Sequence, residues 1–169
     1  MNAADDHFSA GELPEAERFI LFRIDNRRFG IDLDSAERTV HAVEVTPLAG
    51  APDAILGIIN VHGTIVPVFN LRRRFGINER EVDITDQFLL ARRGERTVAL
   101  VADAVLGIAE FVPAEGEARN SGTITGMVEL EDGAAEIHDV MTLLSADDDQ
   151  MLEMALREHS VNKPESKRG

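Results

Sequence analysis

The chain has 169 residues, of which 44% are hydrophobic and 28% are charged, and its net charge is −14. A chain of this size and composition can bury a full hydrophobic core, and the absence of cysteine excludes disulfides, thiol nucleophiles and zinc–thiolate sites. The acidic balance argues against nucleic acid as a partner. Both lysines lie among the last seven residues, which excludes a P-loop or Schiff-base lysine in the folded body.

The two ends of the chain differ in composition from the body. The first seventeen residues contain five acidic side chains and neither Lys nor Arg, so they lack the basic start of a secretory signal. No stretch reaches the ~18 consecutive apolar residues of a membrane-spanning helix. We therefore expect a cytoplasmic protein without direct membrane insertion. An acidic flexible tail is expected over residues 1–16 and a second flexible tail over residues 160–169.

Short strands make up most of the predicted body. Apolar runs and alternating patterns predict strands, in chain order, over residues 18–25, 29–33, 40–45, 57–61, 64–69, 87–91, 97–102, 105–112, 126–130 and 134–140. Many short strands with Gly or Pro at their joints are typical of an all-β barrel or sandwich. The strands fall into two clusters, which predict a first barrel over about 18–79 and a second over about 80–144.

Turns and short helices connect the predicted strands. Single helical turns are expected over residues 34–39 and 52–56, the second ended by Gly57, and a short helix over 71–75. The dipeptide His62–Gly63 is expected to form a two-residue hairpin turn, with Gly at a position that usually requires a positive φ.

A longer C-terminal helix is predicted over about 146–159, beginning after Ser145. Three aspartates in its first turn suit the positive end of the helix dipole. The apolar stripe that would dock this helix on the body consists of Leu152, Ala155, Leu156 and His159.

The sequence offers little for catalysis. The five histidines have no spacing that forms a local metal-ligand pair, so no metal site is predicted. His138 and Asp139 come closest to an acid–base pair, but adjacent residues on a strand point to opposite faces. No Gly-rich phosphate loop or strained serine motif is present, so we expect no catalytic residues and no cofactor. The chain is predicted to be a binding protein; the remote alternative is a small β-barrel hydrolase or isomerase that uses dispersed carboxylates and His138.

One passage resembles a known family signature. The passage is Gly57-Ile58-Ile59-Asn60-Val61-His62-Gly63-Thr64-Ile65-Val66-Pro67-Val68-Phe69-Asn70-Leu71-Arg72. It closely resembles the central motif of the CheW family, the chemotaxis coupling proteins, which is G-x-x-N-L-R-G-x-x-x-P-V-x-D-L-R. Further segments resemble the family's early strand, its v-x-D-x-V strand and its closing hairpin, namely Phe29-Gly30-Ile31-Asp32, Val101-Ala102-Asp103-Ala104-Val105, and Gly126 with Glu131-Asp132-Gly133. The ordered set makes roughly residues 17–157 similar to this family, and we expect a CheW-like domain over residues 17–159.

The resemblance implies a fold and a role. The fold is two five-stranded SH3-like β-barrels packed side by side, with short helical turns and a C-terminal α-helix. The role is a non-enzymatic scaffold that couples the cytoplasmic tips of methyl-accepting chemoreceptors to the regulatory domain of a CheA-type histidine kinase, in receptor arrays at the inner membrane. A CheW-like scaffold in a non-motility pathway, such as surface attachment or pili, is the alternative function.

The resemblance also implies which residues meet these partners. The family's receptor-binding groove between the barrels corresponds here to Ala36, Arg38, Thr39, Val98, Ala99, Val105 and Ile108. The tip of the central hairpin, formed by Asn60, His62 and Gly63, corresponds to the segment where kinase and receptor contacts meet. For the apolar groove positions, packing in the core is an alternative explanation.

Two positions depart from the family pattern. Arg38 stands where the family often has an acid, and His62 stands where it often has Arg. If the two are neighbours across strands, the usual ion pair is lost, and one hypothesis is that this scaffold serves a divergent receptor or kinase set. The alternative is drift at an exposed pair worth ~0–1 kcal/mol.

Overall fold

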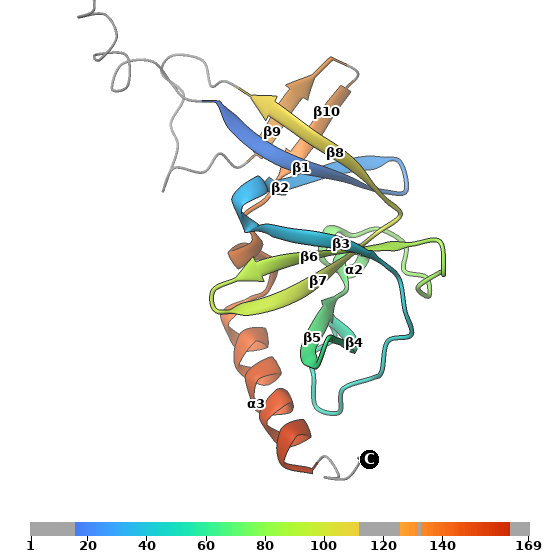
Figure 1. Cartoon of the computed structure of the whole chain (residues 1–169), viewed down its shortest axis with the longest axis vertical. Coiled ribbons are helices and arrows are strands. Elements are labelled where there is room, and N and C mark those ends of the chain that lie inside the picture. The colour runs from blue at the N-terminus through green and yellow to red at the C-terminus, as the bar shows by residue number, and fades with distance from the viewer. Residues whose placement is uncertain (1–15, 112–125, 132, 163–169) are drawn as a thin grey trace, which may run out of the picture.

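The computed structural model describes residues 16–111, 126–131 and 133–162, in which ten strands form two five-stranded sheets (Figure 1). The first sheet has the order β8-β1-β2-β10-β9 and consists of β1 (Glu17–Ile24), β2 (Arg27–Asp32), β8 (Ala104–Phe111), β9 (Gly126–Leu130) and β10 (Gly133–Ile137). The second has the order β3-β6-β7-β5-β4 and consists of β3 (Ala36–His41), β4 (Ile55–Val61), β5 (Thr64–Phe69), β6 (Gln87–Arg93) and β7 (Arg96–Ala102).

Helices connect and flank the sheets. They are two 3-10 turns, η1 (Leu33–Ser35) and η2 (Val140–Leu143), the short α2 (Leu71–Phe75) and the long α3 (Ala146–Asn162). Among the described residues, no helix combines the length and the apolar character needed to cross a lipid bilayer. The ten strands and these few helices confirm the predicted mainly-β fold class.

The predicted division of the strands by sequence halves is wrong. The second sheet is built from a continuous stretch, residues 36–102, whereas the first combines β1 and β2 with β8, β9 and β10. β8 pairs antiparallel with β1, placing Ile20 opposite Ile108, and β10 runs parallel to β2. The β1–β2 hairpin has two open edges, and strands more than seventy residues away in sequence complete them. Apolar periodicity predicts a strand but not its distant partner.

One core joins the two sheets. Its largest cluster brings Phe22 and Phe29 of the first sheet together with Leu89 and Leu100 of the second, and Leu152 of α3 packs on the same cluster. Each sheet also has a smaller apolar cluster of its own. Since the hydrophobic effect scales with buried apolar area, this shared cluster makes the stability of each sheet depend on the other.

The chain enters the second sheet earlier than its sequence predicts. In place of the helical turn expected over 34–39, the structure has the three-residue η1 (Leu33–Ser35). Asp32 caps η1 by accepting a hydrogen bond from the Asp34 N–H at 2.9 Å. β3 then starts at Ala36, so the strand expected over 40–45 ends at His41 instead. Alternation in Ala36–His41 is weak because most of these residues are only half-buried or exposed.

The helical turn expected over 52–56 is also corrected. β4 already begins at Ile55, and Gly57 lies inside it with a φ of +154°. A Cβ at Gly57 would collide with the carbonyl oxygen of Thr46. Thr46 and Ile58 exchange two backbone hydrogen bonds of 2.9 and 2.8 Å, so Gly57 permits a close backbone approach rather than ending a helix.

The predicted helices α2 and α3 are confirmed. Asn70 caps α2 by accepting from the Arg73 N–H, and Gly76 ends it in the left-handed conformation. Ser145 accepts from the Asp148 N–H at 3.1 Å at the start of α3. The buried face of α3 includes Leu152, as its apolar stripe predicts, and the helix continues to Asn162, beyond the predicted end.

Ionic contacts hold the two sheets together where the chain passes from β7 to β8. Asp103 Oδ1 accepts from Arg72 Nη2 at 3.1 Å and from Arg80 Nη2 at 2.7 Å, and Asp103 Oδ2 accepts from the backbone N–H of Asp25 at 2.8 Å. Arg72 Nη2 also contacts Asp25 Oδ1 at 2.8 Å, and this hydrogen bond holds the pKa of Asp25 below its usual value. We call Asp25, Arg72, Arg80 and Asp103 the ionic junction.

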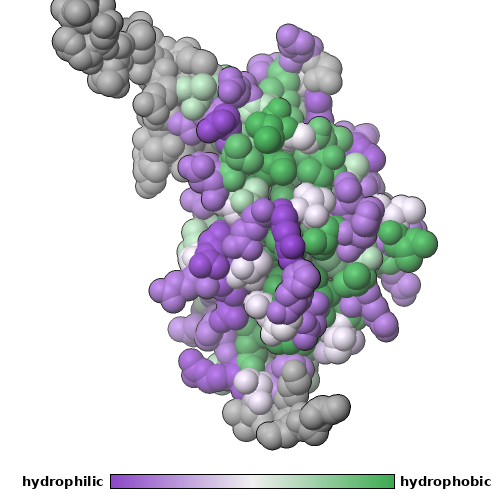
Figure 2. All heavy atoms as spheres, viewed as in Figure 1, coloured by the Kyte–Doolittle hydropathy of each residue, from purple (hydrophilic) through white to green (hydrophobic). Residues whose placement is uncertain are grey.

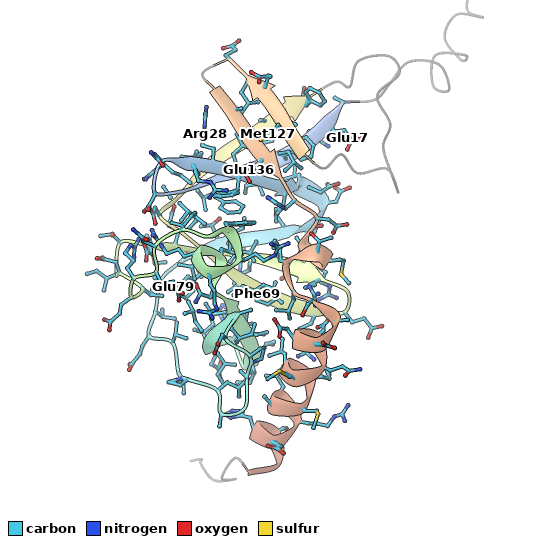
Figure 3. All side chains as sticks on the ribbon, turned by 180° about the vertical axis from the view of Figure 1, so that it is seen from behind. Glu17, Arg28, Phe69, Glu79, Met127 and Glu136 are labelled. Carbon is cyan, nitrogen blue, oxygen red and sulfur yellow. The ribbon has the colours of Figure 1, made fainter. Side chains whose placement is uncertain are left out.

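An aromatic stack joins the first sheet to α2. Phe75 of α2 stacks on Phe29 of β2 with ring centroids 4.4 Å apart, and His138 lies 4.7 Å from Phe75. Glu136, labelled in Figure 3, accepts from Arg27 at 2.8 Å and lies 3.5 Å from His138 Nε2. Burial lowers the pKa of His138, and Glu136 opposes this only in part.

Removing the central carboxylate should destabilise the fold. Asp103→Ala leaves the mostly buried Arg72 with one carboxylate partner fewer and takes the acceptor from Asp25 N–H. We expect the free energy of unfolding in urea to fall by about 1–3 kcal/mol. The matched control is Asp53→Ala, because Asp53 also pairs with an arginine but is 83% exposed; its effect should stay within about 0.5 kcal/mol. Equal losses in the two variants contradict this role of Asp103.

The lowered pKa of His138 should make stability depend on pH. Below the ordinary value of 6.5 the unfolded chain binds a proton at His138 before the folded chain does, so the free energy of unfolding should fall as pH decreases from 6.5 toward the lower folded pKa. His138→Phe keeps an aromatic ring in the stack and should flatten this slope between pH 7.5 and 5. Urea titrations of both chains at each pH measure it, and parallel curves contradict the prediction.

Candidate functional site

An apolar face lies along the seam between the two sheets. Ile20 of β1, Ala36 of β3 and Val105 of β8 are half-buried and pack against the shared core. β8 turns Leu106 and Ile108 outward, with 45% and 61% of their surfaces exposed. Figure 2 shows hydrophobic atoms gathered over the region where β1 and β8 lie in Figure 1. We call these five residues the seam face.

Most residues predicted for the receptor groove border this face. Ala36 and Val105 belong to it, Ile108 is its most exposed member, and Arg38 and Thr39 follow Ala36 on β3. The exposed and half-buried positions therefore come from both sheets, as a surface between barrels requires.

Val98 and Ala99 do not belong to this surface. They are 1% and 0% exposed, because β7 is the central strand of the second sheet and both of its faces are covered. Val98 packs in the shared core and Ala99 in the second sheet's own cluster. For these two positions, burial favours packing in the core as the explanation, and Val98 also lines a pocket beside α3.

The hairpin tip is preorganised. His62 and Gly63 have φ values of 51° and 87°, the pair of positive angles that a two-residue turn requires, which confirms the predicted turn. The side chain of Asn60 accepts from the Gly63 N–H at 2.8 Å and closes the turn. Asn60, His62 and Gly63 are all exposed, so the tip presents a fixed shape to solvent.

Arg38 and His62 are not a pair. Arg38 lies opposite Leu90 on β6, whereas His62 lies at the tip of the β4–β5 hairpin at the other end of the sheet order. Within the described part of the chain, neither side chain makes a hydrogen bond or ion pair. The two departures from the family pattern are therefore separate surface changes. Because the two residues are not neighbours across strands, they do not mark the loss of one ion pair.

A second apolar surface was missed by the sequence. A pocket of about 610 Å³ lies between the segment after β3 and the loop before β6. Its apolar lining includes Val43, Leu56, Val82 and Ile84, and its acidic lining consists of Glu44, Glu81 and Asp83. Ile84 is 86% exposed, and hydrogen bonds from Thr85 hold the pKa of Asp83 below its usual value. We call this the end pocket; its one signal in the sequence is an isoleucine inside a polar loop.

His138 and Asp139 do not form an acid–base pair, and His138 Nε2 instead lies 3.5 Å from the Glu136 carboxylate. The His138 ring is packed in the aromatic stack, and the neighbouring Asp139 carboxylate accepts from the Met141 N–H at 2.9 Å to cap η2. Among the described residues, no group of three His, Asp or Glu side chains could hold a metal ion. The surfaces that stand out are the seam face, the hairpin tip and the end pocket, all suited to binding a macromolecule.

Comparison with known proteins shows which family this chain resembles. Residues 18–148 match the family model of the CheW-like domain. A chemotaxis protein CheW of Klebsiella aerogenes is 28% identical over 157 residues, covering 89% of this chain and 94% of the relative. Protein FrzA of Myxococcus xanthus is 29% identical over 106 residues, covering 63% and 66%.

A solved structure supports the fold. The crystal structure of the scaffolding protein TtCheW from Thermoanaerobacter tengcongensis superposes with a TM-score of 0.66 at 22% sequence identity, covering 79% of this chain and 96% of that one. The two proteins therefore share a fold. Because the family model spans most of the chain, this protein belongs to the CheW-like domain family.

Proposed function

We propose that this protein is a non-enzymatic scaffold that couples the cytoplasmic tips of chemoreceptors to a CheA-type histidine kinase in chemotaxis. Family membership and the names of its relatives support the chemotaxis role. The observation that carries the coupling role is the seam face, where Leu106 and Ile108 of β8 stay exposed although most large apolar side chains of the neighbouring β1 are buried.

The seam face suits the apolar side of a helical hairpin, the form of a receptor tip. An outward-facing strand with two large aliphatic side chains gives such a helix a ridge to pack against. Burying apolar area contributes about 25 cal/mol per Å², so a contact centred on Ile108 needs no deep cavity to give a transient complex. Arg38 on the neighbouring strand adds a charge that can select among receptors.

The kinase regulatory domain is assigned to the other two surfaces. The hairpin tip and the end pocket both belong to the second sheet, at the ends of its strands rather than at the seam. A scaffold that binds two partners at once needs two surfaces that do not overlap, and this arrangement supplies them. A scaffold in a non-motility pathway would use the same surfaces, and co-purification from native cells identifies which receptor and kinase are bound.

Ile108→Asp should weaken receptor binding. The substitution places a charge in the centre of the seam face, and we expect the Kd for a chemoreceptor cytoplasmic-tip fragment to rise at least about tenfold. Met154→Asp is the matched control, because Met154 on α3 is 62% exposed against 61% for Ile108 but lies outside the seam face. Titration calorimetry measures both. Equal affinities for the two variants rule the seam face out as the receptor surface.

Arg38→Glu and His62→Arg should act independently. Since the two side chains do not contact each other, their effects on the free energy of binding a receptor tip should add to within about 0.5 kcal/mol in the double variant. A coupling well above that value means that the two positions meet in the complex. If neither change alters binding of the receptor tip or of the kinase regulatory domain, drift at exposed positions explains both departures.

A further inference from the structure

The loop between α2 and β6 is irregular but firmly attached. Residues 76–86 contain no helix or strand. Arg72 Nη1 donates to the Asn78 carbonyl at 2.8 Å, and Asn70 Nδ2 donates to Glu79 Oε1 at 2.9 Å; Figure 3 labels Glu79. A turn from Asp83 to Asp86 is closed by a backbone hydrogen bond of 2.9 Å and carries the exposed Ile84. The loop therefore displays part of the end pocket in a fixed shape.

Arg80 joins this loop to the ionic junction. Its guanidinium makes two hydrogen bonds of 2.9 Å to the two carboxylate oxygens of Asp86, and its Nη2 also reaches Asp103 Oδ1 at 2.7 Å. The Asp86 side chain is only 2% exposed, and it also accepts from the Asp83 N–H at 2.8 Å. These partners raise the pKa of Arg80, so its charge is permanent. One side chain thus clamps the Ile84 turn to the start of β8.

A second contact ties the same two segments. The side chain of Gln87, the first residue of β6, accepts from the Val105 N–H at 2.7 Å. Val105 belongs to the seam face, and Gln87 directly follows the Ile84 turn. The end of the loop and the beginning of β8 are therefore linked twice, once through Arg80 and once through Gln87.

From these contacts we infer that Arg80 is a positioning residue that couples the seam face to the end pocket. The inference rests on the proposed function, since it concerns its two partner surfaces. A partner that shifts β8 at Val105 moves Asp103 and Gln87, and with them the turn that carries Ile84. A ligand at either surface then favours the same arrangement of the link, so binding at one surface strengthens binding at the other, and the effect is reciprocal.

The Arg80 link can be removed without leaving a buried charge unpaired. Arg80→Met keeps the aliphatic stem of the side chain, and Asp86→Asn made together with it removes the buried carboxylate while keeping an acceptor for the Asp83 N–H. The matched control is Arg96→Met with Glu153→Gln. This second pair also has two hydrogen bonds, of 2.7 and 2.9 Å, but it joins β7 to α3.

The test is the Kd of a receptor-tip fragment, measured with and without a saturating regulatory domain of a CheA-type kinase. We expect the wild-type and control chains to bind the fragment at least about fivefold more tightly when the kinase domain is present. In the Arg80/Asp86 variant only the Gln87 contact remains, so the ratio should fall to about half of its wild-type value or less, while the affinity for the fragment alone stays within about twofold. A merely structural defect would instead lower both affinities and leave the ratio in place.

Amide hydrogen exchange on the whole chain tests the link without any partner. In the Arg80/Asp86 variant, exchange should rise together in the Ile84 turn and at the start of β8, whereas the control variant leaves both unchanged. A rise confined to the turn overturns the inference. The inference is also overturned if the wild-type chain binds both probes but its affinity for the fragment is the same with and without the kinase domain. If the wild-type chain binds neither probe, the proposed function fails, and the coupling of binding fails with it.

Discussion

The relative placement of the two sheets depends on the contacts made where the chain crosses from one sheet to the other. The chain leaves the first sheet after β2 and returns after β7, and Asp103 occupies the return. Its carboxylate accepts hydrogen bonds from Arg72, Arg80 and the Asp25 N–H, so one side chain contacts segments that are far apart in sequence. Shared apolar packing gives the stability, and this junction gives the relative placement that a surface built from both sheets requires.

Local features of the fold were predictable because they rest on short-range chemistry. The hairpin turn at His62–Gly63, the cap of α2 and the start of α3 each depend on a few adjacent residues. Strand partners were not predictable in the same way. A strand such as β8 has the same alternation whichever strand it pairs with, and nothing local indicates that it returns to β1. Gly57 was misassigned for a related reason, since its role depends on Thr46 from another part of the chain.

The candidate site was predictable in part. Resemblance to the family pointed to Ala36, Val105 and Ile108, and these positions do lie along the seam. It could not separate surface from core, so Val98 and Ala99 were included although β7 is covered on both faces. The end pocket was missed because most of its lining comes from two irregular segments, for which periodicity gives no signal. Arg80 was missed as well, since its importance arises only from the three-dimensional position of Asp86 and Asp103.

The interleaved order of the strands also bears on biosynthesis. The second sheet is encoded without interruption and is complete once β7 has left the ribosome, whereas the β1–β2 ribbon, made first, waits for β8 and β10. During that interval both edges of the ribbon offer unsatisfied backbone groups to any neighbouring nascent chain. Arginines at residues 23, 27 and 28, clustered around the turn of this ribbon, place positive charge there and discourage two such ribbons from associating before their own partners arrive.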